Sequence, residues 1–237
     1  MIPFFRKLRK KMADDNRPLK YARYAIGEII LVVIGILIAL QINTWNEERK
    51  ENNIEANYLK EMLKDYEVNL KRSNTVIDSY EKMIPTLKGL IEQSLLEKPS
   101  MSVDSLNLAC MTINDMPTYS SSDRVYNNLI GSGDLRLIKN NELKTELSIY
   151  YEKLHILKLV QTTHEMELVE SFQPYIINNM DFLAVAPQRL EDFRLPIPKE
   201  KDKILEVLHD YEFRNTITLK WVIITDLLEQ NRDLLKS

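Results

Sequence analysis

One stretch of this sequence, residues 25–42, restricts the fold more than any other. It reads AIGEIILVVIGILIALQI, and every residue from Ile29 to Leu40 is apolar or small. Eighteen helical residues at about 1.5 Å each extend roughly 27 Å, close to the thickness of the hydrocarbon core of a bilayer. A surface helix of a soluble domain would carry a polar stripe, and this stretch has none. The pattern predicts a single transmembrane helix over residues 25–44.

The charges on the two sides of this helix are unequal. Residues 1–24 contain eight Lys or Arg and two Asp, whereas the rest of the chain has a net charge of −9. Basic flanks of membrane helices stay in the cytoplasm, so we expect a cytoplasmic basic arm over residues 1–24 and a periplasmic domain over residues 45–237. Tyr21, Tyr24 and Trp45 stand where aromatic side chains meet a membrane interface. The basic arm favours contact with membrane lipid and not with nucleic acid.

A cleaved signal peptide is the alternative interpretation of the apolar stretch. The apolar region of a signal peptide is usually about 7–15 residues long and ends at a small-x-small cleavage site. This region is longer, and the LQIN sequence at residues 40–43 offers no such site. We therefore expect an uncleaved signal-anchor. Cys110 is the only cysteine, so the chain cannot form an intramolecular disulfide.

Beyond residue 45 the sequence has the periodicity of helices. Apolar side chains recur at spacings of four and three over residues 59–91, 143–168 and 204–235, and no useful strand pattern is present. These helices predict an all-α fold in which the transmembrane helix continues into an extramembrane up-and-down bundle.

Turn signals divide these helices. Pro85 is expected to kink or restart the first helix. Ser102 or Asp104 can cap a short helix that ends near Asn114, and residues 117–123 form a loop whose last residues cap another short helix over 124–130. Residues 173–203 contain four of the nine prolines, which predicts a long irregular connection.

Two features of the membrane stretch are candidate contact sites. Gly35 and Ala39 form a small-xxx-small pair on the face that also carries Gly27 and Leu31, a pattern that lets membrane helices pack closely. Glycine is also common in membrane helices without such a role. Glu28 is costly in lipid, so it either reaches the cytoplasmic interface or takes part in helix pairing or proton coupling.

Two polar features of the domain stand out. Gln161 and His164 occupy stripe positions where leucine is expected, and they form either a satisfied polar layer of the bundle or the lining of a ligand cavity. Gly131, Ser132, Gly133 and Asp134 form either a turn at a helix end or a set of backbone N–H groups for an anion. No catalytic, nucleotide-binding or metal-binding motif is present, so we expect no enzyme, no cofactor and no metal.

Two stretches resemble a family of uncharacterised single-pass membrane proteins of gram-negative bacteria. They are AIGEIILVVIGILIALQINTWNEERK and YNNLIGSGDLRLIKNNELKTELSIYY. The resemblance implies an inner-membrane location and a helical periplasmic domain, and it transfers no catalytic residue.

The expected function is protein–protein contact. We expect a scaffold or accessory subunit that forms a homo-oligomer or contacts another membrane protein. The alternative is a small-molecule sensor that signals through a partner, since 24 cytoplasmic residues cannot form a signalling domain.

Overall fold

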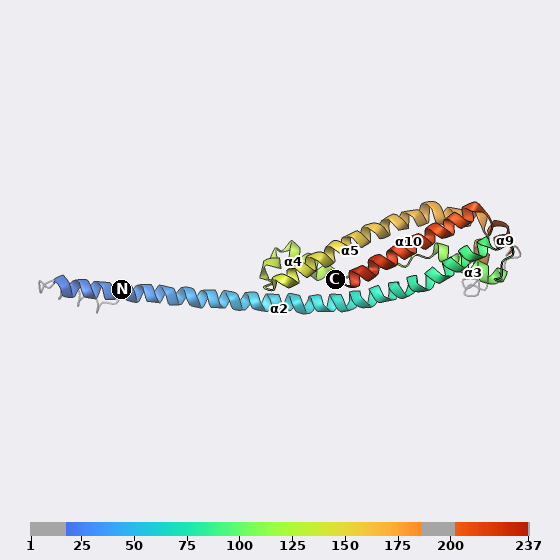
Figure 1. Ribbon diagram of the computed structural model, residues 1–237. Coiled ribbons are helices and arrows are strands. Elements are labelled where there is room, and N and C mark those ends of the chain that lie inside the picture. Colours follow the sequence, from blue (N-terminus) through green and yellow to red (C-terminus); the bar gives the residue numbers. More distant parts are fainter. Residues whose placement is uncertain (1–17, 186–201, 237) are drawn as a thin grey trace. The chain divides into compact units, whose positions relative to one another are not determined.

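The computed structural model describes residues 18–185 and 202–236, and most of the predicted basic arm lies outside these residues. The structure is 86% helical with no strand among the described residues, which confirms the all-α prediction. The chain divides into two compact units, one up to Leu59 and one from Lys60 onward. Figure 1 shows the elements along the chain.

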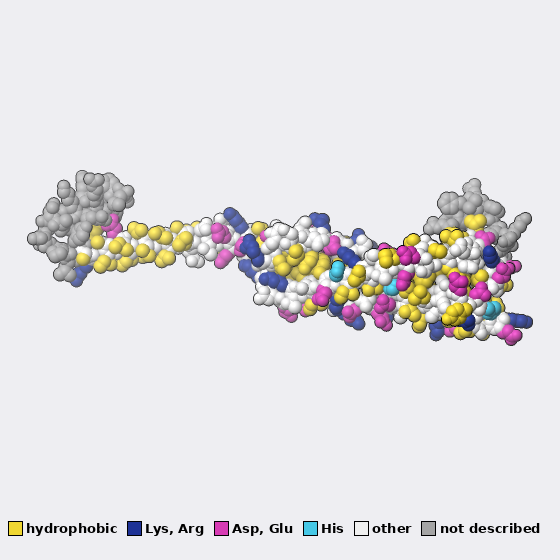
Figure 2. Space-filling model, turned by 90° about the horizontal axis from the view of Figure 1, so that it is seen from above, with side chains coloured by type: hydrophobic (Ala, Val, Ile, Leu, Met, Phe, Trp, Pro, Cys, Tyr) yellow, Lys and Arg dark blue, Asp and Glu magenta, His cyan; other side chains and the backbone are white. Residues whose placement is uncertain are grey.

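Helix α2 (Pro18–Leu95) is a single helix of 78 residues that begins in the first unit and ends in the second. Its N-terminal part is long and apolar enough to cross a membrane, and none of its apolar window is buried. Leu31, for example, is 72% exposed. Figure 2 shows this part of α2 covered by hydrophobic side chains. Just beyond it, the guanidinium of Arg49 lies 5.9 Å from the centre of the Trp45 ring system.

Pro85 does not restart α2, contrary to one of the two expectations for this residue. The helix continues from Ile84 through Pro85 to Leu95. Proline lacks an N–H group, so the hydrogen bond to the carbonyl of Glu81 is missing. The side chains of Leu87 and Leu90 are fully buried on either side of the next turn, and this packing holds the helical conformation.

The second unit contains the C-terminal part of α2 and a series of shorter elements. These are α3 (Val103–Asn114), α4 (Arg124–Gly131), the 3₁₀ turn η1 (Asp134–Leu137), α5 (Asn141–Glu167), the π-helical turn η2 (Leu168–Phe172), α6 (Gln173–Asn179), α7 (Phe182–Val185), α9 (Lys203–Val207) and α10 (Tyr211–Leu235). Ser102 caps α3 as expected, because its side chain accepts a hydrogen bond from the N–H of Ser105 at 3.2 Å.

Two expected boundaries differ from the structure. Residues 173–185, expected to be irregular, contain α6 and α7, because Ile176 and Val185 are buried and Pro174 stands in the first turn of α6, where proline is favourable. The rest of that expected connection, residues 186–201, lies outside the described part. The final helix is in two pieces, because Asp210 adopts an extended conformation before α10 begins.

The long helices of the second unit do not alternate in direction. Helices α5 and α10 are antiparallel, since Lys153 pairs with Asp233 while Phe172 contacts Lys220. Helices α2 and α10 are also antiparallel, since Ser94 meets His209 at one end and Tyr66 lies beside Leu234 at the other. Helices α2 and α5 therefore run in the same direction (Figure 1), unlike the expected up-and-down order. The return between them is made by α3 and an extended segment.

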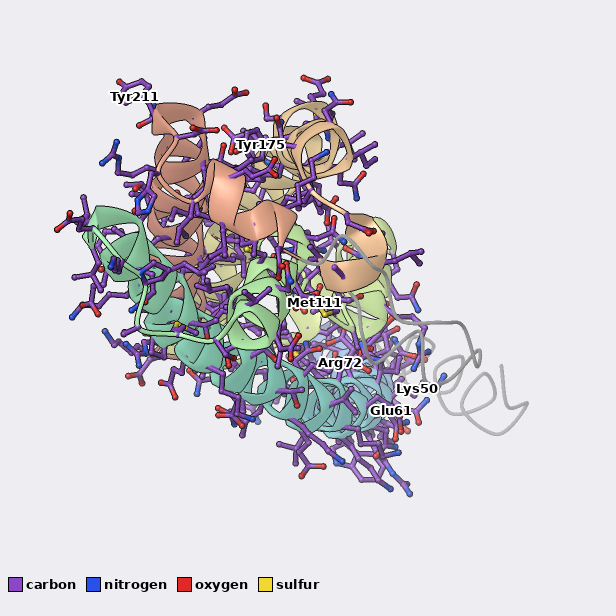
Figure 3. The ribbon with its side chains drawn as sticks, turned by 90° about the vertical axis from the view of Figure 1, so that its right-hand side faces the viewer. Lys50, Glu61, Arg72, Met111, Tyr175 and Tyr211 are labelled. Atoms are coloured by element: carbon purple, nitrogen blue, oxygen red, sulfur yellow. The ribbon has the colours of Figure 1, made fainter. Side chains whose placement is uncertain are left out.

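The core of the second unit lies between these helices. Fully buried side chains come from α2, α3, α5 and α10, among them Leu87, Leu106, Leu154 and Ile224. Figure 3 views this unit end-on, with Met111 of α3 in the interior and Tyr211 at the edge. Tyr211 is 74% exposed.

Candidate functional site

The extended segment of residues 117–123, called the strap from here on, lies between α2 and α5. Two side-chain amides hold its backbone as a neighbouring strand would. Gln161 accepts from the N–H of Tyr119 at 3.2 Å and donates to its carbonyl at 3.1 Å. Asn69 does the same for Ser122, at 2.6 Å and 2.9 Å. The backbone groups of Tyr119 and Ser122 are therefore paired although the strap does not belong to a sheet.

Other side chains of α2 complete this attachment. The hydroxyl of Tyr80 donates to the carbonyl of Pro117, and Arg72 donates to the carbonyl of Ser120 at 3.0 Å. Asp65 accepts from the hydroxyl of Ser122 at 2.8 Å and from the N–H of Val125 at 3.3 Å. Asp65 thus caps α4 from another helix.

The residue that precedes α4 in the sequence does not cap it by its side chain. Asp123 makes no capping hydrogen bond, and its carboxylate accepts from Lys158 at 2.7 Å. The loop and the short helix stand where the sequence predicts them, but the cap comes from Asp65 instead of from the loop.

Gln161 and His164 have different neighbours. Gln161 is buried against the strap, with its amide oxygen and nitrogen both bonded to Tyr119. His164 lies 3.2 Å from the Glu167 carboxylate through Nδ1, and its Nε2 is 3.7 Å from the carboxylate of Asp226 on α10. Gln161 therefore holds the strap by two hydrogen bonds to the backbone of Tyr119, whereas His164 lies between the carboxylates of Glu167 and Asp226.

The Gly131–Asp134 segment forms the end of α4 and the start of η1. Ser132 donates its N–H to Asn128, and Gly133 donates its N–H to Ile130. Gly133 has a φ of +75°, which glycine adopts without strain. Two of the N–H groups that an anion would need are engaged within the turn.

Five tyrosines gather where the strap meets α2, α4 and α5. Tyr126 and Tyr151 are stacked with ring centroids 3.5 Å apart, and Tyr150 stands edge-on to both Tyr66 and Tyr151 at 5.1 Å. The hydroxyl oxygens of Tyr119 and Tyr150 are 3.3 Å apart. Burial raises the pKa of Tyr66, Tyr119, Tyr150 and Tyr151 above that of a free phenol, so these side chains are neutral at physiological pH.

An open cleft of about 300 Å³, called the tyrosine cleft from here on, lies beside this cluster. Three helices form it: Tyr66 comes from α2, Glu146 and Tyr150 from α5, and leucines from α5 and α10. The lining residues are Tyr66, Leu143, Glu146, Leu147, Tyr150, Leu234 and Leu235. Its volume is at the lower end of the range of small-molecule sites, and its lining is mostly apolar with one charged group.

Lys220, in the middle of α10, is a buried charge that the pattern analysis missed. It is 1% exposed, and its ammonium lies 5.2 Å from the centre of the Phe172 ring. Burial lowers its pKa to about 8, while the charges of Asp115 and Glu167 oppose this shift. Lys220 follows Ile217 by three residues and precedes Ile224 by four, so its place on the buried stripe was the available signal.

Phe172 belongs to the π-helical turn η2, a feature that often occurs at functional sites. The nearby Cys110 is no candidate nucleophile, because full burial raises the pKa of its thiol to about 12. Among residues 18–185 and 202–236, no group of three or more His, Cys, Asp or Glu is arranged to hold a metal ion.

The predicted membrane contact residues lie along the exposed N-terminal part of α2. Gly27, Leu31, Gly35 and Ala39 recur every four residues and are exposed. A Cβ atom added at Gly27 or Gly35 would have no described atom within 4 Å apart from its chain neighbours and the adjacent backbone of its own helix. For the other residues named in this region, Glu28 and Tyr24 are half-buried, Trp45 is exposed, and the side chain of Tyr21 lies outside the described part.

These observations define an all-α protein with one helix that is apolar enough to cross a membrane. The chain belongs to the family of unknown function DUF6090, which matches residues 28–181, about two thirds of its length. No curated protein and no solved structure matches the chain.

Proposed function

We propose that residues 25–44 anchor this protein in the inner membrane of a gram-negative bacterium, with the basic arm in the cytoplasm and the domain in the periplasm. The apolar stretch is fully exposed in the chain and needs a nonpolar solvent. The eight basic residues before it favour this orientation.

Reporter fusions test this orientation. Alkaline phosphatase fused after Ser237 is active only outside the cytoplasm, whereas green fluorescent protein fused there folds only inside. We expect an active phosphatase and no fluorescence. The opposite pair of results would contradict the proposed orientation. Release of the fusion protein from membranes by high salt would contradict the proposed membrane anchor.

We propose further that the protein acts by binding a membrane partner, either a second copy or another protein, as a scaffold or accessory subunit. The observation that carries this proposal is the open face of Gly27, Leu31, Gly35 and Ala39, which has no described neighbour within the chain. Small residues let a second helix approach closely, and packing is the main source of helix association in lipid. We assign the protein no catalytic role.

The test is a pull-down of the full-length chain from its native membrane in mild detergent, followed by mass spectrometry. Replacing Gly35 and Ala39 with leucine should remove the partner while the far-ultraviolet circular dichroism stays unchanged. The matched control is Val33→Leu with Leu37→Ile on the opposite face. Retention of the partner by the Gly35→Leu, Ala39→Leu variant would overturn the proposed contact face.

The tyrosine cleft favours a second candidate function, sensing of a small molecule. A ligand in the cleft would contact Tyr66, and Tyr66 belongs to α2, the helix that also contains the apolar stretch. A metabolite that binds the folded state raises the melting temperature by linkage. A metabolite screen with the full-length protein would support sensing if one compound raised the melting temperature in proportion to the logarithm of its concentration.

A further inference from the structure

The tyrosine cleft combines two aromatic walls with an apolar floor. The rings of Tyr66 and Tyr150 meet at 77° with centroids 5.1 Å apart, so the edge of one ring packs against the face of the other. Both residues line the cleft side by side. Leu147 and Leu234 are almost fully buried and form the floor. The electron-rich face of a tyrosine ring attracts a cation placed within about 6 Å of its centre.

The charge beside these walls is negative. Glu146 is the only charged residue among the lining residues of the cleft, and it is exposed at the mouth. Burial is the main cause of the raised pKa of Tyr66 and Tyr150, and the carboxylates of Asp65 and Asp123 add smaller contributions in the same direction. Lys158 neutralises Asp123, and Lys236 follows the lining residue Leu235 at the end of α10. Within the cleft itself, no cation offsets Glu146.

We propose that the tyrosine cleft binds an organic cation, an ammonium group with a short apolar tail. The ammonium lies between the Tyr66–Tyr150 pair on one side and the Glu146 carboxylate on the other, and the tail lies on the leucines. A carboxylate and the face of an aromatic ring attract a cation, whereas they repel an anionic ligand. The volume of about 300 Å³ holds a ligand of metabolite size and excludes a folded chain. This inference rests on the second candidate function, small-molecule sensing.

Hydrogen bonds to the hydroxyl group of Tyr150 hold one side of the cleft in place before a ligand arrives. Tyr150 is held by the Tyr119 hydroxyl and by Asn69, whose amide nitrogen is 3.4 Å from the Tyr150 oxygen. Asn69 and Tyr119 are in turn tied into the strap. A wall that is held in place costs little entropy when the ligand binds, so the strap acts as a support of the site.

Isothermal titration calorimetry of the full-length protein in dodecyl maltoside tests the proposal with three probes that share a six-carbon tail. These are hexyltrimethylammonium, 1-hexanol and hexanoate, and heats from protein-free micelles are subtracted. We expect hexyltrimethylammonium to bind at least about fivefold more tightly than 1-hexanol, and hexanoate to bind weakest.

Two variants locate the binding. Glu146→Gln should weaken the binding of hexyltrimethylammonium by about fivefold to tenfold and leave the binding of 1-hexanol unchanged. Glu142 is exposed one turn earlier on α5, so Glu142→Gln serves as the matched control. Leu143→Trp fills the cleft and should abolish binding of both probes. Circular dichroism and the melting temperature of Leu143→Trp test whether this variant folds.

The outcomes separate the ligand class from the sensing function. If 1-hexanol binds as tightly as hexyltrimethylammonium and Glu146→Gln changes neither affinity, the cleft is an apolar site without preference for a cation. That result overturns the inferred ligand class and leaves the sensing function in place. Tighter binding of hexanoate than of hexyltrimethylammonium would also overturn the inferred preference for a cation. If none of the three probes binds the folded wild-type protein, the inferred cation site is overturned, and the metabolite screen tests the sensing function separately.

Discussion

Lys220 is the only charged side chain that is buried among the described residues. Its side chain is 1% exposed and lies against the ring of Phe172, with the carboxylates of Asp115 and Glu167 as the charges that oppose its desolvation. A buried charge of this kind destabilises a fold unless its partners compensate for the lost hydration. Its pKa of about 8 shows that compensation is incomplete.

The first prediction concerns the pH dependence of stability. The folded amine loses its proton near pH 8, whereas the unfolded amine keeps it until about pH 10.5. Between these values the unfolded state binds more protons, so the free energy of unfolding rises with pH, in total by about 3 kcal/mol. Below pH 8 both states are protonated and this contribution is constant. Denaturant titrations from pH 7 to 10.5 measure the effect.

The Lys220→Met variant is the control for this rise. Ionisation of buried tyrosines lowers stability at high pH in both proteins, so the difference between the two proteins isolates Lys220. At pH 7 we expect Lys220→Met to be more stable by about 1–3 kcal/mol, with the gap closing as the pH increases. A gap that is independent of pH would contradict the lowered pKa.

Gln161 gives the second prediction. Gln161→Leu removes both hydrogen bonds to Tyr119 and leaves a buried N–H and a buried carbonyl without partners, so we expect a loss of about 3 kcal/mol. Hydrogen exchange at the Tyr119 amide should also become faster. Thr162→Val, on the exposed side of the same helix, should change stability little. Equal effects of the two variants would show that the hydrogen bonds between Gln161 and Tyr119 make no specific contribution to stability.

At the scale of elements, the periodic helices were predictable and the strap was not. The stripes of α2, α5 and α10 and the cap of α3 follow from local rules that the sequence displays directly. The strap has no apolar period, and the amides of Asn69 and Gln161 that hold it look like ordinary polar residues in the sequence. The strap lies between α2 and α5, which run in the same direction, and the up-and-down order that we expected is not confirmed.

The third prediction belongs to α4, whose cap lies on another helix. Asp65→Ala removes the acceptor for the N–H of Val125 and for the Ser122 hydroxyl, and we expect a loss of about 1–2 kcal/mol. Amides in the first turn of α4 should lose protection from hydrogen exchange more than those of α10. Asp78 is exposed and lies on α2, as Asp65 does, so Asp78→Ala is the matched control.

A different result would assign the cap to the loop. If Asp123→Ala exposes the first turn of α4 and Asp65→Ala does not, the local residue is the cap. We expect Asp123→Ala to lose only its ion pair with Lys158, which contributes about 0–1 kcal/mol at a partly exposed site.

At the scale of the whole molecule, the candidate site was only partly visible in the sequence. Gln161 and His164 stood out because they interrupt a leucine stripe, and both are at or near the core. Tyr66, Tyr150 and Leu147 fit their stripes and looked like ordinary core residues. A cleft forms where three stripes fail to fill the space between helices, and no single helix carries that information.

The last prediction concerns the two units. Every buried apolar residue among the described residues lies between Met62 and Leu234, so the second unit contains its whole core. We therefore expect a fragment of residues 60–237 to fold without the membrane stretch and to remain soluble without detergent. It should be strongly helical by circular dichroism and unfold cooperatively, with a melting temperature within about 4–8 °C of the same transition in the full-length protein, equivalent to about 1 kcal/mol.

A fragment of residues 80–237 provides the contrast. It lacks Met62, Asn69, Val76 and Ile77, all of them buried, and Asp65 and Arg72, which bond the strap. The strap would then keep only its attachments to Tyr80 and to α5, and we expect the 80–237 fragment to aggregate or to lose its cooperative transition. If the two fragments behave alike, the N-terminal part of α2 in this unit is dispensable for folding. If 60–237 itself fails to fold, the core depends on residues before Lys60.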